Sequence, residues 1–222
     1  MEKFALIVAG GSGTRMKGKI PKQFLELNGK PVLMHTFEAF QKYDSKIRFV
    51  LVLPEVQLIN WKKLCVKYDF KIKHSLVSGG ETRFQSVKNG LSKINEDGIV
   101  FIHDGVRPLV SVKTIENCYK TAHEKGNALP VVSPAESVRE KVNENSRSVD
   151  RHRYFLVQTP QTFKIPIIKK AYEQTYHKKF TDDASVLENT GQKIHLVNGN
   201  RSNIKITYPE DLLIASSLQS AL

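Results

Sequence analysis

Short apolar runs alternate along the chain with longer segments in which apolar residues recur every three or four positions. Runs of the first kind are typical of strands buried in a sheet, and the second spacing is typical of helices that pack one face on a core. The predicted strands are 4–9, 47–53, 71–77, 98–103 and 127–132. The predicted helices are 31–42, 55–68, 82–94, 111–125, 166–177, 182–190 and 209–221.

This alternation predicts an α/β fold with a Rossmann-like, mostly parallel sheet flanked by helices. Pro31, Pro166 and Pro209 suit the first turn of a helix. Ser111 and Thr181 are predicted helix N-caps. In such sheets ligands bind beyond the carboxyl ends of the strands. The residues that follow each strand are therefore the first place to look for function.

The first predicted strand ends at a turn that is rich in glycine and followed by basic residues. Gly10, Gly11 and Gly13 let the backbone approach a ligand, and successive free N–H groups in such a turn bind anions. Arg15 and Lys22 add positive charge at the same place. The turn therefore predicts a cradle for a nucleotide polyphosphate, with a plain glycine-rich turn as the alternative interpretation.

Two common glycine motifs do not fit this turn. The dinucleotide fingerprint G-x-G-x-x-G matches Gly11 and Gly13, but Met16 stands where the third glycine belongs. The Walker pattern G-x-x-x-x-G-K-[ST] is satisfied as far as Lys19, but Ile20 has no hydroxyl group for Mg²⁺. The chain is thus neither a typical nicotinamide dehydrogenase nor a typical P-loop protein.

Residues 8–24 carry a resemblance to a known family. Ala-Gly-Gly-Ser-Gly-Thr-Arg-Met followed by Pro-Lys-Gln-Phe resembles the opening of the sugar-nucleotide pyrophosphorylase superfamily, and within it the 2-C-methyl-D-erythritol 4-phosphate cytidylyltransferases. Six motifs in the order of that family extend the resemblance over 4–220. In this loop it implies nucleotide contacts by Ala9, Gly10, Gly11 and Gly13, and catalytic roles for Arg15 and Lys22.

The segment 78–86, after the third predicted strand, joins paired glycines to the start of a helix. Paired glycines let the chain pass close to a base or ribose, and a helix N-terminus favours anions. A plain strand-to-helix turn is the alternative. In the resembled family this segment contacts the cytidine base, which implies nucleotide-binding roles for Gly80, Glu81 and Ser86.

The sequence His-Asp-Gly-Val-Arg-Pro, residues 103–108, follows the fourth predicted strand. A carboxylate at a strand end beside a phosphate site suits Mg²⁺, which takes few protein carboxylates and completes its shell with phosphate and water. Asp104 is the predicted metal ligand, with a turn-capping aspartate as the alternative, and His103 is predicted to be structural. The resemblance places Asp104 and Gly105 at the nucleotide and Arg107 at the substrate phosphate.

Residues 133–154 interrupt the alternation of strands and helices. Two short alternating runs flank a polar turn at 143–146, which predicts a β-hairpin that projects from the sheet. An isolated two-stranded arm is marginal in water, so it is expected to pack on another surface, most simply a second copy. A flexible loop is the alternative. The resemblance implies a homodimer in which Ser137 and Arg151 reach the sugar phosphate bound by the partner.

Two motifs after the arm contribute hydroxyl groups. By the resemblance, Thr159 and Thr181 contact the phosphate of the substrate. The adjacent Asp182 and Asp183 point to different sides of a helix, which argues against a two-metal carboxylate pair. We therefore predict that they are first-turn acids that complement the helix dipole, with a substrate contact by Asp182 as a further option.

The last motif lies near the C-terminus. Ile204 and Ile206 alternate around Lys205, which predicts a strand with one buried face and Lys205 on the opposite face. An edge-strand lysine without a special role is the alternative. The resemblance implies that Lys205 reaches the triphosphate and acts in catalysis.

Composition narrows the class of protein. With 222 residues, 40% of them apolar and 25% charged, the chain is expected to be one globular domain, residues 1–222. It has no apolar run long enough to span a membrane and no predicted leader, so a cytoplasmic protein without membrane contact is expected. Cys65 and Cys118 are far apart and are expected to be reduced.

The net charge of +12 raises the question of nucleic acid. The basic residues are spread along the whole chain without a basic run or an aromatic platform, so we predict a lysine-rich solvated surface and no nucleic-acid partner.

The resemblance implies transfer of CMP from CTP to 2-C-methyl-D-erythritol 4-phosphate, with Mg²⁺ as cofactor and release of pyrophosphate. Ribitol 5-phosphate or another alditol phosphate is the alternative acceptor, and 149–151 together with 181–185 favour the erythritol enzymes. A non-catalytic nucleotide-binding module is the rival from another class.

Overall fold

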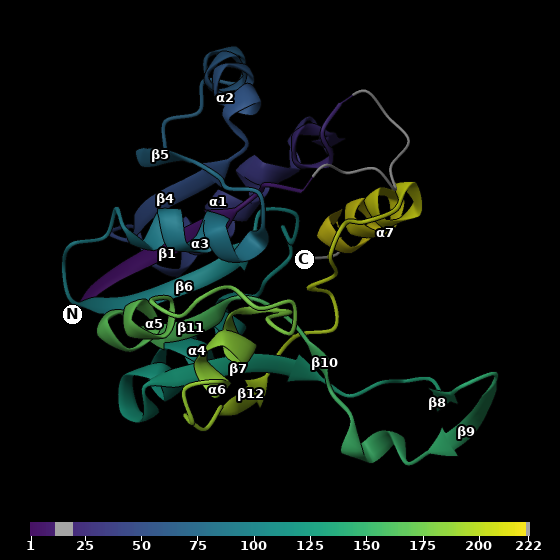
Figure 1. Cartoon of the computed structure of the whole chain (residues 1–222). Coiled ribbons are helices and arrows are strands. Elements are labelled where there is room, and N and C mark those ends of the chain that lie inside the picture. The colour runs from purple at the N-terminus through teal and green to yellow at the C-terminus, as the bar shows by residue number, and fades with distance from the viewer. Residues whose placement is uncertain (12–19, 221–222) are drawn as a thin grey trace.

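The molecule is built around a central sheet of short strands (Figure 1). The computed structural model describes residues 1–11 and 20–220, so the predicted site residues Gly13 and Arg15 lie outside the described residues. The strands of the sheet are β1 (Glu2–Val8), β4 (Arg48–Leu53), β5 (His74–Ser78), β6 (Gly98–Asp104), β7 (Asn127–Val132), β10 (Leu156–Val157), β11 (Gln161–Lys164) and β12 (Leu196–Asn198).

Within the described residues the strand order is β10-β7-β11-β6-β1-β4-β5, with β12 paired to β7. The ladders of β1 with β4 and β6, of β4 with β5, and of β12 with β7 are parallel. Those of β11 with β6 and β7, and of β10 with β7, are antiparallel. The predicted mostly parallel α/β sheet is therefore confirmed, while β11 was not among the predicted strands.

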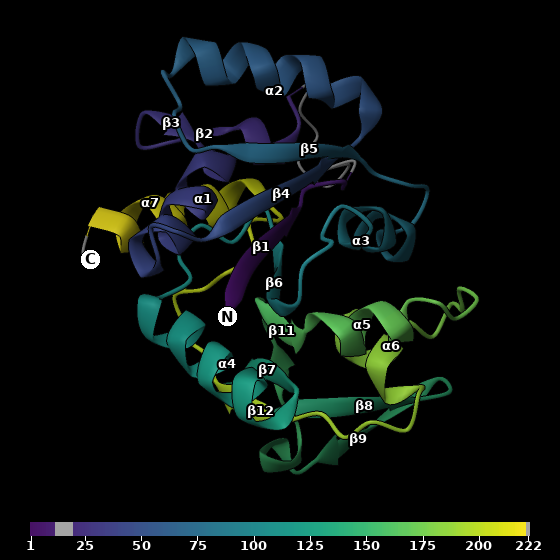
Figure 2. The same cartoon turned by 90° about the vertical axis from the view of Figure 1, so that its left-hand side faces the viewer.

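Helices cover both faces of the sheet (Figure 2). One face packs on α1, α2 and α4, and the other on α3, α5 and α6. No helix in the described part of the chain is long and apolar enough to cross a membrane. The helices are α1 (Val32–Tyr43), α2 (Glu55–Lys67), α3 (Arg83–Leu91), α4 (Val112–Lys125), α5 (Ile165–Ala171), α6 (Asp183–Glu188) and α7 (Pro209–Ser220), with the 3-10 helices η2 (Lys22–Phe24) and η3 (Arg151–Arg153).

The central strand β1 shows why the sequence folds this way. Ala5 and Ile7 face the cluster under α1, α2 and α4, whereas Leu6 faces the opposite cluster, and all three are fully buried. Burial of a large aliphatic or aromatic side chain contributes about 1.5–3 kcal/mol relative to exposure. A strand that is apolar on both faces can be stable only between two layers of helices, which fixes its place at the centre.

The segment 133–154 contains the predicted hairpin. Strands β8 (Val138–Val142) and β9 (Asn145–Val149) pair antiparallel around a turn in which Asn143 has a positive φ of 52°. Asparagine tolerates this left-handed conformation better than most residues. The hairpin extends away from the sheet and its helices (Figure 1). The projecting arm is confirmed, and its packing on a second copy stays a prediction.

Three local predictions are wrong. The chain around Lys205 forms no strand, although Ile206 is buried and its N–H donates to the carbonyl of Val106. The N-cap of α6 is Asp182 rather than Thr181, because Asp182 and Ser185 satisfy each other's backbone N–H groups in a capping box. Pro31 precedes α1 instead of lying in its first turn, and it pairs in the short hairpin of β2 (Glu26–Leu27) and β3 (Lys30–Pro31).

Candidate active site at the carboxyl ends of the strands

Most of the predicted site residues in the described part of the chain converge where the parallel strands end. The last residue of β1, Val8, is in register with Asp104, the last residue of β6. The loop after β5 lies at the same edge, since β5 runs parallel to β4 and β4 to β1. A cavity of about 450 Å³ opens there. Its lining residues are Val8, Ala9, Gly10, Gly11, Lys22, Gln23, Gly80, Glu81, Thr82, Arg83, Ser86, Asp104, Val106 and Lys205.

The 79–86 loop is held in a fixed shape by one hydroxyl group. Ser86 Oγ accepts from the N–H of Gly80 at 3.1 Å and donates to the carbonyl of Thr82 at 2.9 Å. A Cβ atom at Gly80 would come within 2.2 Å of Gln85 Cγ, so a larger residue would displace that side chain. The Thr82 side chain caps α3 by accepting from the N–H of Gln85. The predicted base-binding segment therefore forms a rigid wall of the cavity.

The opposite wall carries Lys22, which η2 holds in place. Lys22 is buried, and its Nζ donates to the carbonyl of Ile206 at 3.1 Å. The neighbouring Gln23 side chain donates to the carbonyl of Ala9 at 3.0 Å and so ties η2 to the end of β1. Gly105 lies behind this wall, where a Cβ atom would be only 2.8 Å from that of Ala9. The predicted residues Ala9, Gly10, Gly11 and Lys22 thus line one cavity together.

A second cavity of about 310 Å³ adjoins the first. Arg83, Asp104 and Lys205 line both, so these three side chains form the boundary between them. The remaining lining residues of the second cavity are Arg107, Val157, Gln158, Thr159, Gln161, Thr181 and Asp182. The predicted substrate-binding residues Arg107, Thr159 and Thr181 are therefore brought together in a space separate from that of the predicted nucleotide-binding residues.

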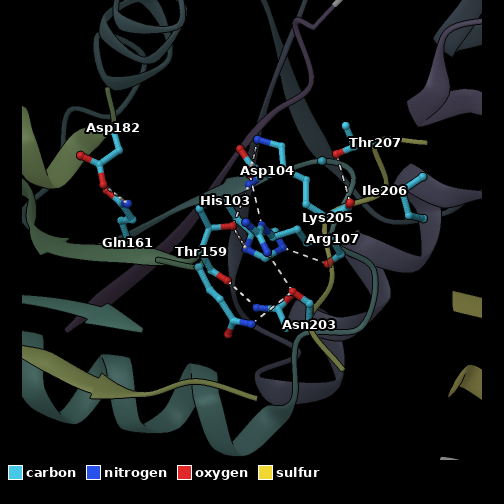
Figure 3. Close-up of polar contacts among 12 residues, drawn as sticks. His103, Asp104, Arg107, Thr159, Gln161, Asp182, Asn203, Lys205, Ile206 and Thr207 are labelled. Atoms are coloured by element: carbon cyan, nitrogen blue, oxygen red, sulfur yellow. Dashed lines mark hydrogen bonds and ion pairs between the residues drawn. The ribbon is translucent and has the colours of Figure 1, made fainter. Parts of the chain in front are cut away.

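Asp104 is the acidic member of this boundary and pairs with two basic side chains (Figure 3). Its Oδ2 lies 2.9 Å from Lys205 Nζ and 3.2 Å from Arg107 Nε, and its side chain is only 11% exposed. Burial alone would raise the pKa of this carboxyl, but Lys205, Arg83 and Arg107 together hold it well below its usual range. The carboxylate is therefore ionised at any physiological pH.

Beneath Asp104, a buried polar network fixes the segment 103–107 (Figure 3). His103 Nε2 donates to the carbonyl of Arg107 at 3.0 Å, and its Nδ1 accepts from the Thr159 hydroxyl at 3.0 Å. The same hydroxyl accepts from the N–H of Asp104 at 3.1 Å. Burial lowers the pKa of His103 to about 4, so the ring is neutral. The structural role predicted for His103 is confirmed by these contacts.

Asn203 extends the network to the segment that carries Lys205. Its side chain donates to the carbonyl of Thr159 at 2.8 Å, while its own carbonyl accepts from Arg107 at 2.8 Å. These two bonds fasten an irregular segment where the sequence predicted a strand. They place Lys205 at the cavity boundary with its side chain 42% exposed. Asn203 is a supporting residue that the sequence did not single out.

At the far side of the second cavity, Gln161 organises the start of α6. It donates to Asp182 Oδ2 at 2.7 Å and accepts from the N–H of Ala184 at 2.8 Å. Thr181 is exposed at this end of the cavity. Asp183 was predicted to be a first-turn acid that complements the helix dipole. It does lie in the first turn of α6, but it is also fully buried and forms an ion pair with Arg83, which was not predicted. A partner 100 residues away leaves no local signal in the sequence.

The two arm residues predicted to bind substrate lie elsewhere. Ser137 and Arg151 are exposed and line neither cavity, and the Arg151 guanidinium donates to the carbonyl of Ala135. This placement agrees with the prediction that they serve a partner's site, but it does not test that prediction. Gly13 and Arg15, the remaining predicted residues of the glycine loop, belong to the part of the chain that is not described.

The donor set at the boundary suits an ion that takes few ligands from protein. Among the described residues, no three His, Cys, Asp or Glu side chains cluster as a metal site. Asp104 offers one ionised carboxylate beside a cavity with a glycine-lined wall. Mg²⁺ is usually bound by one or two protein carboxylates together with substrate phosphates, so a single carboxylate such as Asp104 can be sufficient. Chemically, the arrangement can hold a polyphosphate and a second anion side by side.

Comparison with known proteins identifies the family. The model of the 2-C-methyl-D-erythritol 4-phosphate cytidylyltransferase family matches residues 4–220. A protein of that name from Phocaeicola vulgatus is 51% identical over 98% of this chain and 100% of its own length. Another from Clostridium perfringens is 41% identical over 95% of this chain and 96% of its own length.

Solved structures agree with these relatives. The 4-diphosphocytidyl-2C-methyl-D-erythritol synthase of Anaerococcus prevotii superposes with a TM-score of 0.83 at 25% identity, covering 99% of this chain and 98% of that one. The 2-C-methyl-D-erythritol 4-phosphate cytidylyltransferase of Thermus thermophilus gives 0.78 at 27% identity, with coverage of 99% and 100%. From the match over nearly its full length, this chain belongs to the 2-C-methyl-D-erythritol 4-phosphate cytidylyltransferase family.

Proposed function

We propose that this protein transfers CMP from CTP to 2-C-methyl-D-erythritol 4-phosphate and so takes part in the non-mevalonate synthesis of isoprenoid precursors. The products are 4-diphosphocytidyl-2-C-methyl-D-erythritol and pyrophosphate. Family membership supports this reaction, and residues 1–222 would act as one catalytic domain. The observation that carries the proposal is the boundary of Asp104, Lys205 and Arg83, at which a nucleotide-sized cavity meets a smaller basic one.

The acceptor needs no general base. The second pKa of a phosphate monoester is about 6, so the attacking oxygen is already an anion near neutral pH. This oxygen forms a bond to the α-phosphorus of CTP while the bond to the bridging oxygen breaks, and pyrophosphate leaves with that electron pair. His103 is engaged by Thr159 and by the Arg107 carbonyl, which agrees with a mechanism that uses no histidine base.

The protein's main contribution is fixed positive charge and alignment. Lys22 and Lys205 line the nucleotide cavity and would stabilise the charge on the triphosphate as it develops. Arg107 would bind the acceptor phosphate in the second cavity, with Thr181 at its far end. Thr159 lines the same cavity, and its hydroxyl, which donates to His103, would hold the wall in place. One preorganised donor of this kind typically contributes about 10²–10³-fold in rate. From the sequence, Arg15 is proposed to stabilise the charge on the triphosphate together with these lysines.

Mg²⁺ is the proposed cofactor, and Asp104 would hold it. The ionised carboxylate and its position at the nucleotide cavity support this assignment. When bound, the ion would neutralise charge on the phosphates of CTP. The role of the protein is to keep Asp104 ionised and oriented, which Lys205 and Arg107 achieve through their ion pairs.

The homodimer is also a proposal. The exposed β8–β9 arm and the exposed apolar residues Tyr154, Phe155, Leu156 and Val157 at its base suit a surface that is covered by a second copy. Ser137 and Arg151 would then complete the acceptor site of the partner. We propose a cytoplasmic location because the nucleotide substrate is made there, with neither nucleic acid nor membrane as a partner.

The decisive experiment measures pyrophosphate release for each of the four common nucleoside triphosphates with 2-C-methyl-D-erythritol 4-phosphate and with ribitol 5-phosphate. We expect turnover with CTP and the erythritol phosphate and at least about 10²-fold lower kcat/KM for the other pairs, because the wrong base or acceptor leaves buried polar groups unpaired. Preference for ribitol 5-phosphate would reassign the acceptor. Nucleotide binding without any turnover would contradict the proposed reaction.

A further inference from the structure

A buried ion pair crosses the site between Arg83 and Asp183. Arg83 Nη1 lies 2.7 Å from Asp183 Oδ1, and Nη2 lies 2.6 Å from Oδ2, so two parallel hydrogen bonds join the groups. The Arg83 side chain is 32% exposed, whereas that of Asp183 is fully buried. Two parallel bonds fix both the distance and the relative orientation of the groups, which a single contact between point charges does not.

The carboxylate of Asp183 is held by more than its arginine partner. The Tyr172 hydroxyl donates to Asp183 Oδ1 at 2.6 Å, and the stacked ring of Phe84 lies against the Tyr172 ring with centroids 4.7 Å apart. Burial would lower the pKa of Arg83, but Asp183 raises it above its ordinary value, so the guanidinium keeps its charge. The pair is therefore a rigid unit embedded between α3, α5 and α6.

This unit joins the two loops that form the two cavities. Arg83 is the first residue of α3 and directly follows the nucleotide loop with Gly80 and Thr82. Asp183 is the first residue of α6 and directly follows Asp182 at the acceptor cavity. One bidentate contact thus links the two loops directly, beside the stacking of Phe84 on Tyr172 and Phe180.

We propose that Arg83 and Asp183 are positioning residues that hold the nucleotide loop and the acceptor loop at the spacing needed for in-line attack. Apart from Arg83 itself, each cavity keeps its lining groups without the pair, so either substrate is expected still to bind. What is lost is the alignment between the acceptor oxygen and the α-phosphorus. Misplacement of reacting groups by about 1 Å can cost about 10²-fold in rate. The inference rests on the proposed transfer reaction.

Stability alone gives no reason for this arrangement. Replacement of a buried ion pair by well-packed apolar residues is often neutral or stabilising, because two charges must be desolvated to form the pair. Arg83 also lines both cavities with about a third of its side chain exposed. An arginine held by a buried carboxylate at this boundary fixes the distance and orientation of one loop relative to the other. An apolar contact fixes the orientation less strictly, because it has no directional hydrogen bonds.

The test compares Arg83→Met, Asp183→Asn and the double variant in the pyrophosphate-release assay, with both KM values and kcat determined. We expect each single variant to lower kcat by about 10²-fold with KM values within about threefold of wild type. The double variant is expected to lose about 10²-fold as well, and not about 10⁴-fold, because the two residues act as one unit. Arg83→Lys, which keeps the charge but not the parallel bonds, is expected to recover less than a tenth of the wild-type kcat.

Arg48→Met is the matched control, since it removes an arginine whose ion pair with Glu96 is on the surface, at 2.6 Å. It should leave kcat unchanged. Thermal melting of every variant separates loss of folded protein from loss of rate, and Arg83→Lys carries the test if Asp183→Asn does not fold. Wild-type kcat in Arg83→Lys, or a raised KM for one substrate with kcat intact in Arg83→Met alone, would overturn the proposal. Failure of the wild-type chain to turn over would contradict the proposed function instead.

Discussion

The site at the carboxyl ends of the strands (the strand-end site) and the projecting arm, residues 133–154, differ in how their side chains are held. Around Asp104 most of the predicted site residues are buried or partly buried, and contacts between distant parts of the chain join Asp104 to Thr159 and to Lys205. In the arm, β8 and β9 contact mainly each other, and their side chains are largely exposed. Both regions contain predicted substrate-binding residues, but only the first has the geometry of a site within one chain.

This difference shows which part of the proposed site a single chain can form and which part needs a second chain. A cavity lined by Lys205 and Arg107 can orient an anion without help, because Arg107 is itself held by the carbonyl of Asn203 and Lys205 by Asp104. Among the described residues, the side chain of Arg151 in the arm is held by the carbonyl of Ala135 and by no comparable network. A role for the arm in catalysis therefore requires a second surface, which makes the two regions separately testable.

The largest expected effect comes from breaking the strand-end site. Lys205→Ala removes a cation that lies 2.9 Å from Asp104 on the boundary of both cavities, and kcat is expected to fall by about 10²–10³-fold. Steady-state pyrophosphate release at saturating substrates measures this change. Lys71→Ala is the control, because the Lys71 ion pair with Asp69 is 80% exposed on both sides and should not affect turnover. A fall of less than tenfold in Lys205→Ala would remove this lysine from the catalytic groups.

The next effect tests whether the arm serves another chain. Arg151→Ala is expected to lower kcat/KM for the acceptor phosphate by about 10–100-fold, the range of a lost charge-assisted hydrogen bond. If the arms exchange, mixing Arg151→Ala with Lys205→Ala forms heterodimers in which one of two sites is intact. Random pairing then restores about a quarter of the wild-type activity. Mixtures no more active than the two separate variants would show that the arm acts on its own chain or not at all.

A separate prediction concerns stability and leaves the reaction aside. Burial lowers the pKa of His103 to about 4 in the folded protein, against about 6.5 when unfolded. The unfolded chain therefore binds more protons between these values, and the unfolding free energy falls as pH drops from about 6.5 to about 4, by about 3 kcal/mol from this residue. His103→Gln should show a correspondingly shallower pH dependence in urea unfolding.

A matched change in the arm sharpens the stability comparison. Glu140 pairs with Arg147 at 2.6 Å across β8 and β9, and both side chains are largely exposed. Glu140→Gln should change the unfolding free energy by less than about 0.5 kcal/mol, both at about pH 6.5 and at about pH 4. Equal pH profiles for wild type and His103→Gln would show that the buried ring does not control acid stability.

The sequence predicted the local features well because they depend on neighbouring residues. Short apolar runs predicted the buried strands, and the glycines with Lys22 predicted a loop that lines the first cavity. Anion binding by this loop stays a prediction. The predicted strand around Lys205 was wrong because alternating burial also arises when an irregular segment is fastened by Asn203. Spacing cannot separate these cases, since in both Lys205 is exposed between the less exposed Ile204 and Ile206.

What the sequence by itself determined is the order of strands and helices, the loops that follow each strand, and the family that these motifs resemble. Only the tertiary structure decided which loops meet. It brought Arg83 to Asp183 across 100 residues and placed Asp104 between Lys205 and Arg107. The physical reason is that pairing of buried charges depends on through-space distance and desolvation, which the spacing of residues along a chain does not encode.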